Sequence, residues 1–89
     1  LERVVTQRIA EGGEKSYTAK LVRDGVKRVA QKVGEEGVET ALAATAGTNE
    51  ELAGEAADLL FHLLVLLRAK GLALADVTRV LEQRHATKK

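Results

Sequence analysis

The stretch 59–67 most constrains how this chain can fold, because it is apolar on almost every side if it is helical. Its sequence is LLFHLLVLL, in which His62 is the one polar residue. A helix of this kind is buried all round in a folded protein. A helical subunit of 89 residues cannot easily cover it alone. We therefore predict an all-α protein whose helical-hairpin subunit forms a four-helix-bundle core in a homodimer, or in a higher homo-oligomer.

The rest of the chain carries the periodicity and the boundary signals of helices. Apolar residues recur at helical spacing on both sides of the apolar stretch, and the chain has no Pro to interrupt them. Glycines at 12–13, 47 and 71 mark helix ends. Thr48 followed by Glu51 is the sequence of a capping box, which opens a helix. The predicted helices are 1–11, 17–24, from 26 to before Gly47, from Thr48 to Lys70, and from about Leu74.

The composition narrows the possible functions. A chain without Cys has no disulfide, no thiol chemistry and no thiolate zinc site. A net charge of +1 argues against a general nucleic-acid binder. The apolar stretch is far shorter than the ~20 residues of a membrane span, and no secretory or transit segment is recognisable. We expect one soluble cytoplasmic domain over 1–89 with a basic tail from about 85. Because the sequence holds no Met, we expect a few native residues before Leu1.

Two acidic pairs are the strongest chemical signal in the chain. Glu36 and Glu39 are three residues apart, and so are Glu55 and Asp58. In helices this spacing puts each pair on one face, with Cβ atoms about 5–6 Å apart, where like charges destabilise the helix. A short turn makes the two helices antiparallel neighbours, so the pairs fall at matching heights and four carboxylates can converge.

Four converging carboxylates predict a site for a hard divalent cation. All-oxygen ligation favours Mg²⁺, with Mn²⁺ as a substitute, and Mg²⁺ bound in this way usually takes further oxygens from a phosphorylated substrate. Neither acidic pair has a His at the place that the Glu-x-x-His motif of a di-iron bundle requires. The chain also lacks Cys, closely paired His for a zinc site, and a phosphate-binding P-loop. The competing interpretation is a solvated acidic face. Gly34 and Gly37 flank the first pair, where bare backbone suits either a close ligand or tight helix packing.

Four more residues are candidates near the acids, and each has a second interpretation. Glu35 could be an outer-shell group or the base for an attacking water, or else a surface glutamate. Lys32 could bind phosphate, or form an ion pair one turn along its helix. Lys20 could close over the site, or be a solvated lysine. His62 lies one turn after Asp58 and could partner the site, or be a core histidine. We assign Glu35 as the catalytic candidate and Lys20, Lys32 and His62 as substrate-binding candidates.

Three segments of this chain resemble one family of enzymes: 16–21 (SYTAKL), 32–36 (KVGEE) and 55–67 (EAADLLFHLLVLL). The acidic spacing over 35–58 is similar to the metal motif of the all-α NTP pyrophosphatases, the MazG-like superfamily. Within that superfamily the three segments resemble the phosphoribosyl-ATP pyrophosphohydrolases. The resemblance covers nearly the whole chain, from Leu1 to about Arg84.

The resemblance implies Mg²⁺-dependent hydrolysis of phosphoribosyl-ATP to phosphoribosyl-AMP and pyrophosphate, the second step of histidine biosynthesis, in a helical homo-oligomer. Glu35 matches the family's leading acid. Gly37 stands where many members have Ala, and Ala73 where Ser often caps the last helix. Neither departure touches the chemistry. By the family's pattern, four residues match the metal ligands: Glu36, Glu39, Glu55 and Asp58.

Two alternative functions remain open at this point. The same chemistry could act on a housecleaning nucleotide such as a dNTP, as in other MazG-like enzymes. A non-enzymatic helical oligomerisation module would explain the apolar stretch without any chemistry. Metal-dependent pyrophosphate release separates the enzymes from the module, and substrate preference separates the two enzymes.

Overall fold

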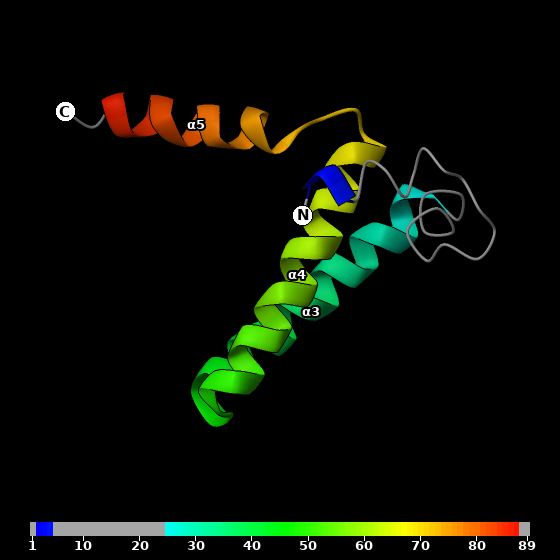
Figure 1. Ribbon diagram of the computed structural model, residues 1–89, viewed down its shortest axis with the longest axis vertical. Helices are drawn as coiled ribbons and strands as arrows, with labels where there is room; N and C mark the ends of the chain where they lie inside the picture. Colours follow the sequence, from blue (N-terminus) through cyan, green and yellow to red (C-terminus); the bar gives the residue numbers. More distant parts are fainter. Residues whose placement is uncertain (1, 5–24, 88–89) are drawn as a thin grey trace.

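The computed structural model describes residues 2–4 and 25–87, and all regular structure in these ranges is helical. This confirms the predicted all-α class. Three long helices follow one another: α3 (Val26–Ala46), α4 (Asn49–Ala69) and α5 (Leu74–Thr87) (Figure 1). Residues 2–4 are helical as well. The predicted helix over 17–24 and most of the predicted helix over 1–11 lie outside the described residues.

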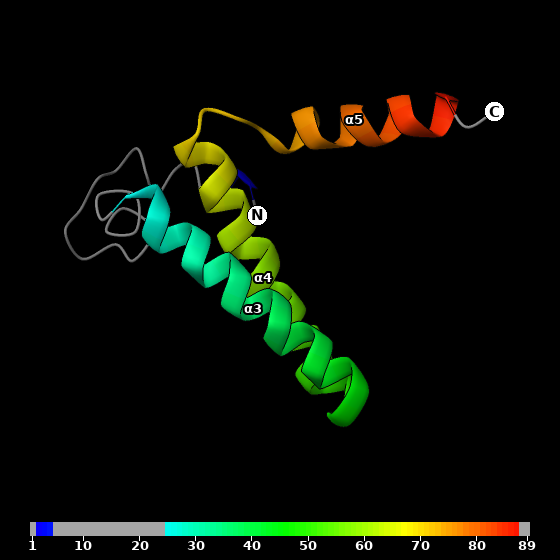
Figure 2. The same ribbon diagram turned by 180° about the vertical axis from the view of Figure 1, so that it is seen from behind.

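Helices α3 and α4 form the predicted antiparallel hairpin and lie side by side in both views (Figures 1 and 2). The backbone N–H of Gly47 donates to the Ala43 carbonyl at 3.0 Å and ends α3. Thr48 then opens α4 with the predicted capping box. Its hydroxyl accepts from the Glu51 N–H at 3.1 Å, and the Glu51 carboxylate accepts from the Thr48 N–H at 3.0 Å. This tight turn places the two acidic pairs on neighbouring helices.

The core of the hairpin is small. Its buried apolar side chains among the described residues are Val29 of α3 and Leu64 and Val65 of α4. The apolar stretch of α4 is not buried on all sides within the subunit, since Leu60 stays 45% exposed. Burying one side chain of this size stabilises the folded state by about 1.5–3 kcal/mol. Three such side chains are therefore a weak core for a small domain. The prediction of a homodimer therefore stays open. Partly buried neighbours of the core are Phe61, Leu66, Leu67 and Leu74.

Helix α5 projects away from the hairpin (Figures 1 and 2). The connection begins at Gly71, whose φ of 77° lies in the left-handed region that favours glycine, as its predicted role as a helix end requires. Asp76 caps α5, because its Oδ2 accepts from the Ala73 N–H at 2.9 Å. Ala73 has no hydroxyl to complete the capping box. Near this connection, the Leu74 N–H donates to Glu2 Oε1 at 3.2 Å.

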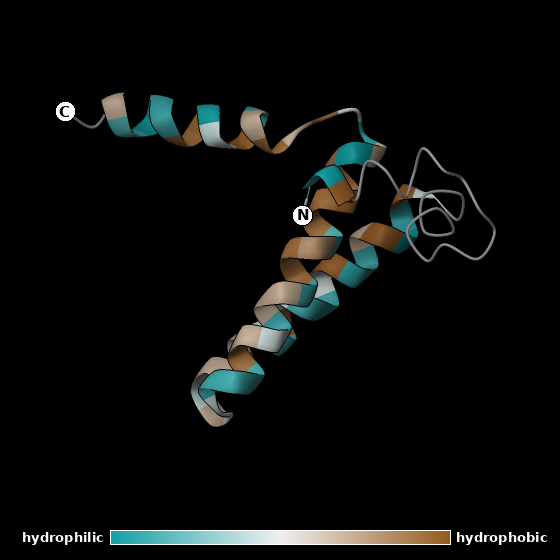
Figure 3. Ribbon diagram, viewed as in Figure 1, coloured by the Kyte–Doolittle hydropathy of each residue, from teal (hydrophilic) through white to brown (hydrophobic). Residues whose placement is uncertain are grey.

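All three long helices have exposed apolar side chains. Figure 3 shows the apolar residues along each helix as brown ribbon. Val38 and Leu42, one turn apart on α3, are 62% and 61% exposed. None of the helices in the described ranges combines the length and the hydropathy of a membrane span. Exposed apolar surface of this kind typically marks a site of interaction. On the other helices the exposed apolar residues are Leu60, Val80 and Leu81, and Leu72 is exposed in the connection before α5.

Candidate active site

A groove lies between α3 and α4 close to the turn that joins them. It has a volume of about 590 Å³ and is open to solvent. Three of the four predicted metal ligands line it: Glu39 from α3, and Glu55 and Asp58 from α4. The fourth, Glu36, lies one helical turn before Glu39 and has a side chain that is 12% exposed. The hairpin thus brings together acidic groups from two helices that are neighbours both in sequence and in space.

The other three carboxylates affect the ionisation of Glu55. A hydrogen bond with Glu39 raises the pKa of Glu55 above its ordinary value of 4.5. Burial and the negative charges of Glu39, Asp58 and Glu36 raise this pKa further. A hydrogen bond between two carboxyl groups requires a proton on one of them. The concentrated negative charge therefore favours a bound proton, or a cation in its place.

The donor atoms at the groove fit a hard divalent cation. Glu36 Oε1 and Glu55 Oε2 are buried, and neither has a hydrogen-bond partner among the described residues. Burying an oxygen without a partner costs free energy, and a cation would offset this cost. In their present rotamers, however, no three Asp, Glu or His side chains of the described ranges stand close enough together to hold an ion. Rotation of the glutamate side chains is needed to form a coordination shell.

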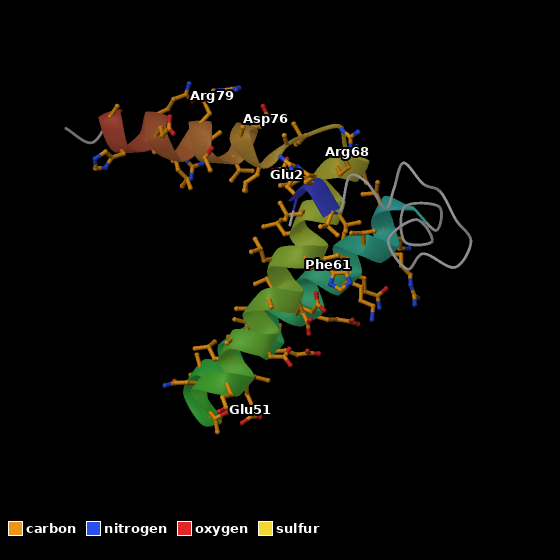
Figure 4. The ribbon with its side chains drawn as sticks, viewed as in Figure 1. Glu2, Glu51, Phe61, Arg68, Asp76 and Arg79 are labelled. Carbon is orange, nitrogen blue, oxygen red and sulfur yellow. The ribbon has the colours of Figure 1, made fainter. Side chains whose placement is uncertain are left out.

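His62 lies beside the acids, in the buried part of α4. Its Nδ1 is 2.6 Å from Glu36 Oε1 and 3.0 Å from the carbonyl oxygen of Asp58. The ring also meets the ring of Phe61 edge to face, with centroids 5.2 Å apart (Phe61 is labelled in Figure 4). Only 6% of His62 is exposed, and it is not one of the residues that line the groove. Its predicted contact with substrate stays a prediction.

The other candidates are placed as follows. Glu35 is exposed, does not line the groove, and accepts a hydrogen bond from Gln31 Nε2 at 3.2 Å. Lys32 is half-buried, and its alternative ion pair with Glu36 is not formed in the described part of the chain. Lys20 lies outside the described residues. The roles predicted for these residues therefore stay predictions.

The two glycines beside the first acidic pair are not explained by packing within the described part of the subunit. A Cβ added at Gly34 or at Gly37 would meet no atom there within 4 Å. The space beside α3 at this height is open. This geometry is compatible with the interpretation that a ligand or a partner helix approaches the bare backbone.

The sequence interpretation missed the apolar wall of the groove. Leu42 and Ala43 of α3 and Gly54 of α4 line it together with the acids. Leu42 and Ala43 follow Glu39 by three and four residues, so the helical spacing could have identified them. Glu51 lines the groove as well as capping α4, and it lies at the foot of the hairpin (Figure 4). The groove is therefore acidic along one part and apolar along another.

Comparison with known proteins identifies the family. A family model described as phosphoribosyl-ATP pyrophosphohydrolase matches residues 1–85. The chain belongs to the phosphoribosyl-ATP pyrophosphohydrolase family. The phosphoribosyl-ATP pyrophosphatase of Pyrobaculum calidifontis is 63% identical over 84 residues, which cover 94% of this chain and 89% of that protein. The corresponding protein of Pyrobaculum arsenaticum is 58% identical over 85 residues, covering 96% and 90%.

Other relatives are longer proteins. The histidine biosynthesis bifunctional protein HisIE of Photobacterium profundum is 56% identical over 85 residues, which cover 96% of this chain but 41% of that protein. The chain thus spans about two fifths of the length of this bifunctional relative. The family match confirms the predicted family and, with it, the predicted class of enzyme, a hydrolase.

Proposed function

We propose that this phosphoribosyl-ATP pyrophosphohydrolase family member hydrolyses phosphoribosyl-ATP to phosphoribosyl-AMP and pyrophosphate, the second step of histidine biosynthesis, in the groove between α3 and α4. The observation that carries the proposal is the groove lined by Glu39, Glu55 and Asp58 from two antiparallel helices, with Glu36 one helical turn before Glu39. The family match and the names of the relatives supply the substrate.

The cofactor in this proposal is Mg²⁺, with Mn²⁺ as a substitute. Hard cations prefer carboxylate oxygens, and the buried Oε2 of Glu55, which has no hydrogen-bond partner among the described residues, supports the choice. When bound, the cation polarises a phosphoryl oxygen and activates a water molecule. The residues that would hold it are Glu36, Glu39, Glu55 and Asp58.

The remaining residues of the site act on the water and on the phosphates. Glu35 follows Gly34 on the exposed side of α3. We assign it the role of the general base that accepts a proton from the attacking water. Lys32 and Lys20 would bind the negative charge of the triphosphate and of the leaving pyrophosphate.

The assembly in this proposal is a homodimer with a four-helix-bundle core. Val38 and Leu42 of α3 and Leu60 of α4 expose apolar surface that the small subunit core does not use. A second copy that packs its own hairpin on this face would bury these side chains on both subunits. The open space beside Gly34 and Gly37 allows a partner helix to come close.

Pyrophosphate release tests the proposed function. With phosphoribosyl-ATP as substrate we expect release that depends on Mg²⁺ and is faster than with any member of a dNTP panel. The variant with Glu36→Gln and Glu55→Gln should fold normally by circular dichroism and lose the activity. Glu82→Gln, on the exposed surface of α5, is the matched control and should retain it.

Two outcomes would contradict the proposal. A preference for a dNTP would assign the chain to nucleotide housecleaning. No release from any substrate by the unsubstituted protein would leave the non-enzymatic oligomerisation module as the better account.

A further inference from the structure

The contact between His62 and Glu36 joins the two helices of the hairpin at the height of the site. His62 is on α4 and Glu36 is on α3, and 2.6 Å separates Nδ1 of the one from Oε1 of the other. Both side chains are largely buried, at 8% and 12% exposed. The ring is held from two other directions, by Phe61 and by the backbone of Asp58. A polar pair so confined restricts the rotamers of both side chains.

The partners of Nδ1 determine which ring nitrogen carries a proton. The carbonyl oxygen of Asp58 can only accept a hydrogen bond, and so can an ionised Glu36 carboxylate. Because the Asp58 carbonyl can only accept, its 3.0 Å hydrogen bond with Nδ1 requires a proton on that nitrogen, and Glu36 Oε1 lies 2.6 Å from the same nitrogen. His62 therefore presents an N–H donor, and no lone pair, to the metal-ligand side of the site.

We propose that His62 is a positioning residue: its Nδ1–H holds Oε1 of Glu36, which presents the other carboxylate oxygen of Glu36 to the cation. This inference rests on the metal site of the proposed function. In the structure the Nδ1–H bonds to the Asp58 carbonyl, and Glu36 Oε1 lies close by without hydrogen-bond geometry. The proposed role therefore includes a rotation of the Glu36 side chain that lets Oε1 share this N–H. When a group that orients a metal ligand is removed, the metal affinity of the site typically falls by about 10–100-fold.

The burial of His62 argues against direct contact with substrate. The groove is lined by the acids and by the small apolar residues near the turn, and His62 is not part of its wall. A ring that is 6% exposed and packed against Phe61 has little surface to offer a nucleotide. Its effect on the reaction is expected to pass through Glu36.

Two substitutions separate positioning from packing. His62→Leu removes the donor and keeps much of the volume, whereas His62→Asn keeps an N–H near the position of Nδ1. Binding of Mn²⁺ to the protein without substrate, followed by electron paramagnetic resonance, is the primary readout. We expect His62→Leu to weaken Mn²⁺ binding by about 10–100-fold and His62→Asn to stay within about threefold of the unsubstituted protein. At saturating Mg²⁺, the KM of His62→Leu for phosphoribosyl-ATP should be unchanged.

A second measurement uses the unsubstituted protein and does not depend on how the variants fold. The chain contains two histidines, so nitrogen NMR of the labelled imidazoles can assign both. We expect Nδ1 of His62 to carry its proton with and without Mg²⁺, and its resonance to shift when Mg²⁺ is added.

Several results would overturn the role of His62. These are unchanged Mn²⁺ affinity in His62→Leu, equal losses in the Leu and Asn variants, an unprotonated Nδ1, or a raised KM with normal Mn²⁺ binding. If the unsubstituted protein bound no Mn²⁺ at all, the metal site of the proposed function would fail together with this role.

Discussion

Glu55 is half-buried on α4 and is surrounded by the carboxylates of Glu36, Glu39 and Asp58. Without a cation, this arrangement costs free energy whenever all four groups are ionised. The raised pKa of Glu55 expresses this cost, because the folded chain retains a proton that the unfolded chain would release. In the proposed function, a bound cation would offset this cost.

The stability of the metal-free protein should accordingly depend on pH through Glu55. Its pKa in the folded chain lies above the value of 4.5 expected in the unfolded chain, so its stabilising contribution is fully present below pH 4.5 and is lost as pH rises through the raised pKa. Glu55→Gln removes this loss. We therefore expect the free energy of unfolding of Glu55→Gln minus that of the unsubstituted protein to rise with pH. Urea titrations in the presence of a chelator measure this difference.

Glu82→Gln, on the exposed surface of α5, is the control for the effect of the substitution itself. Excess Mg²⁺ should stabilise the unsubstituted protein more than Glu55→Gln. A difference for Glu55→Gln that does not change between acid and neutral pH would contradict the proposed repulsion.

The sequence predicts which acidic residues share a helix face, but not how their side chains are oriented. The three-residue spacing was enough to bring Glu39, Glu55 and Asp58 to one groove. It could not show that Glu36 lies against His62, because that contact depends on rotamers and on the rotation of α3 relative to α4. Spacing within a helix is a local property, whereas contact between helices is set by packing.

At the scale of helices, the turn between α3 and α4 is the part of the fold that the sequence determines most directly. Gly47, Thr48 and Glu51 supply a helix stop and a complete capping box, and the structure contains both. The extent of burial of α4 was less predictable. Its apolar residues show what can be buried, but one subunit offers too little surface to cover Leu60. The prediction of complete burial is wrong for the single subunit, and it stays a prediction for an assembly.

Thr48→Ala should lower the free energy of unfolding by about 1 kcal/mol, within a range of about 0.5–2 kcal/mol, because the Glu51 N–H loses its acceptor. Urea denaturation at fixed pH and Mg²⁺ concentration measures the change. Thr48→Ser keeps the hydroxyl and should cost much less. Equal losses in the two variants would show that the capping hydrogen bond is not what stabilises the turn.

At the scale of the whole molecule, exposed apolar surface outweighs the buried core. The described residues have only three buried apolar side chains, while Val38, Leu42, Leu60 and the apolar side of α5 remain exposed. A subunit with this balance gains stability by association, since the same side chains leave water when a second copy covers them. The sequence predicts association, which stays a prediction. It does not specify which faces meet, because several exposed apolar surfaces are available.

Replacing Val38 and Leu60 together by Glu should prevent the proposed association, because charges would be buried in the apolar interface. Sedimentation equilibrium should show the unsubstituted protein at twice the 9.5 kDa chain mass, or at a higher multiple, and the double variant at a single chain mass. Ala44→Glu, at an exposed position about 200° around α3 from Leu42, is the control and should still associate. A monomeric unsubstituted protein would contradict the proposed dimer.

The central claim is that carboxylates from both helices of the hairpin bind one divalent cation. Anomalous diffraction from crystals grown with Mn²⁺ tests it most directly. We predict one strong anomalous peak within about 2.0–2.6 Å of carboxylate oxygens from Glu36, Glu39, Glu55 and Asp58. A well-ordered hairpin with no such peak, or with Mn²⁺ bound only away from these four side chains, would contradict it.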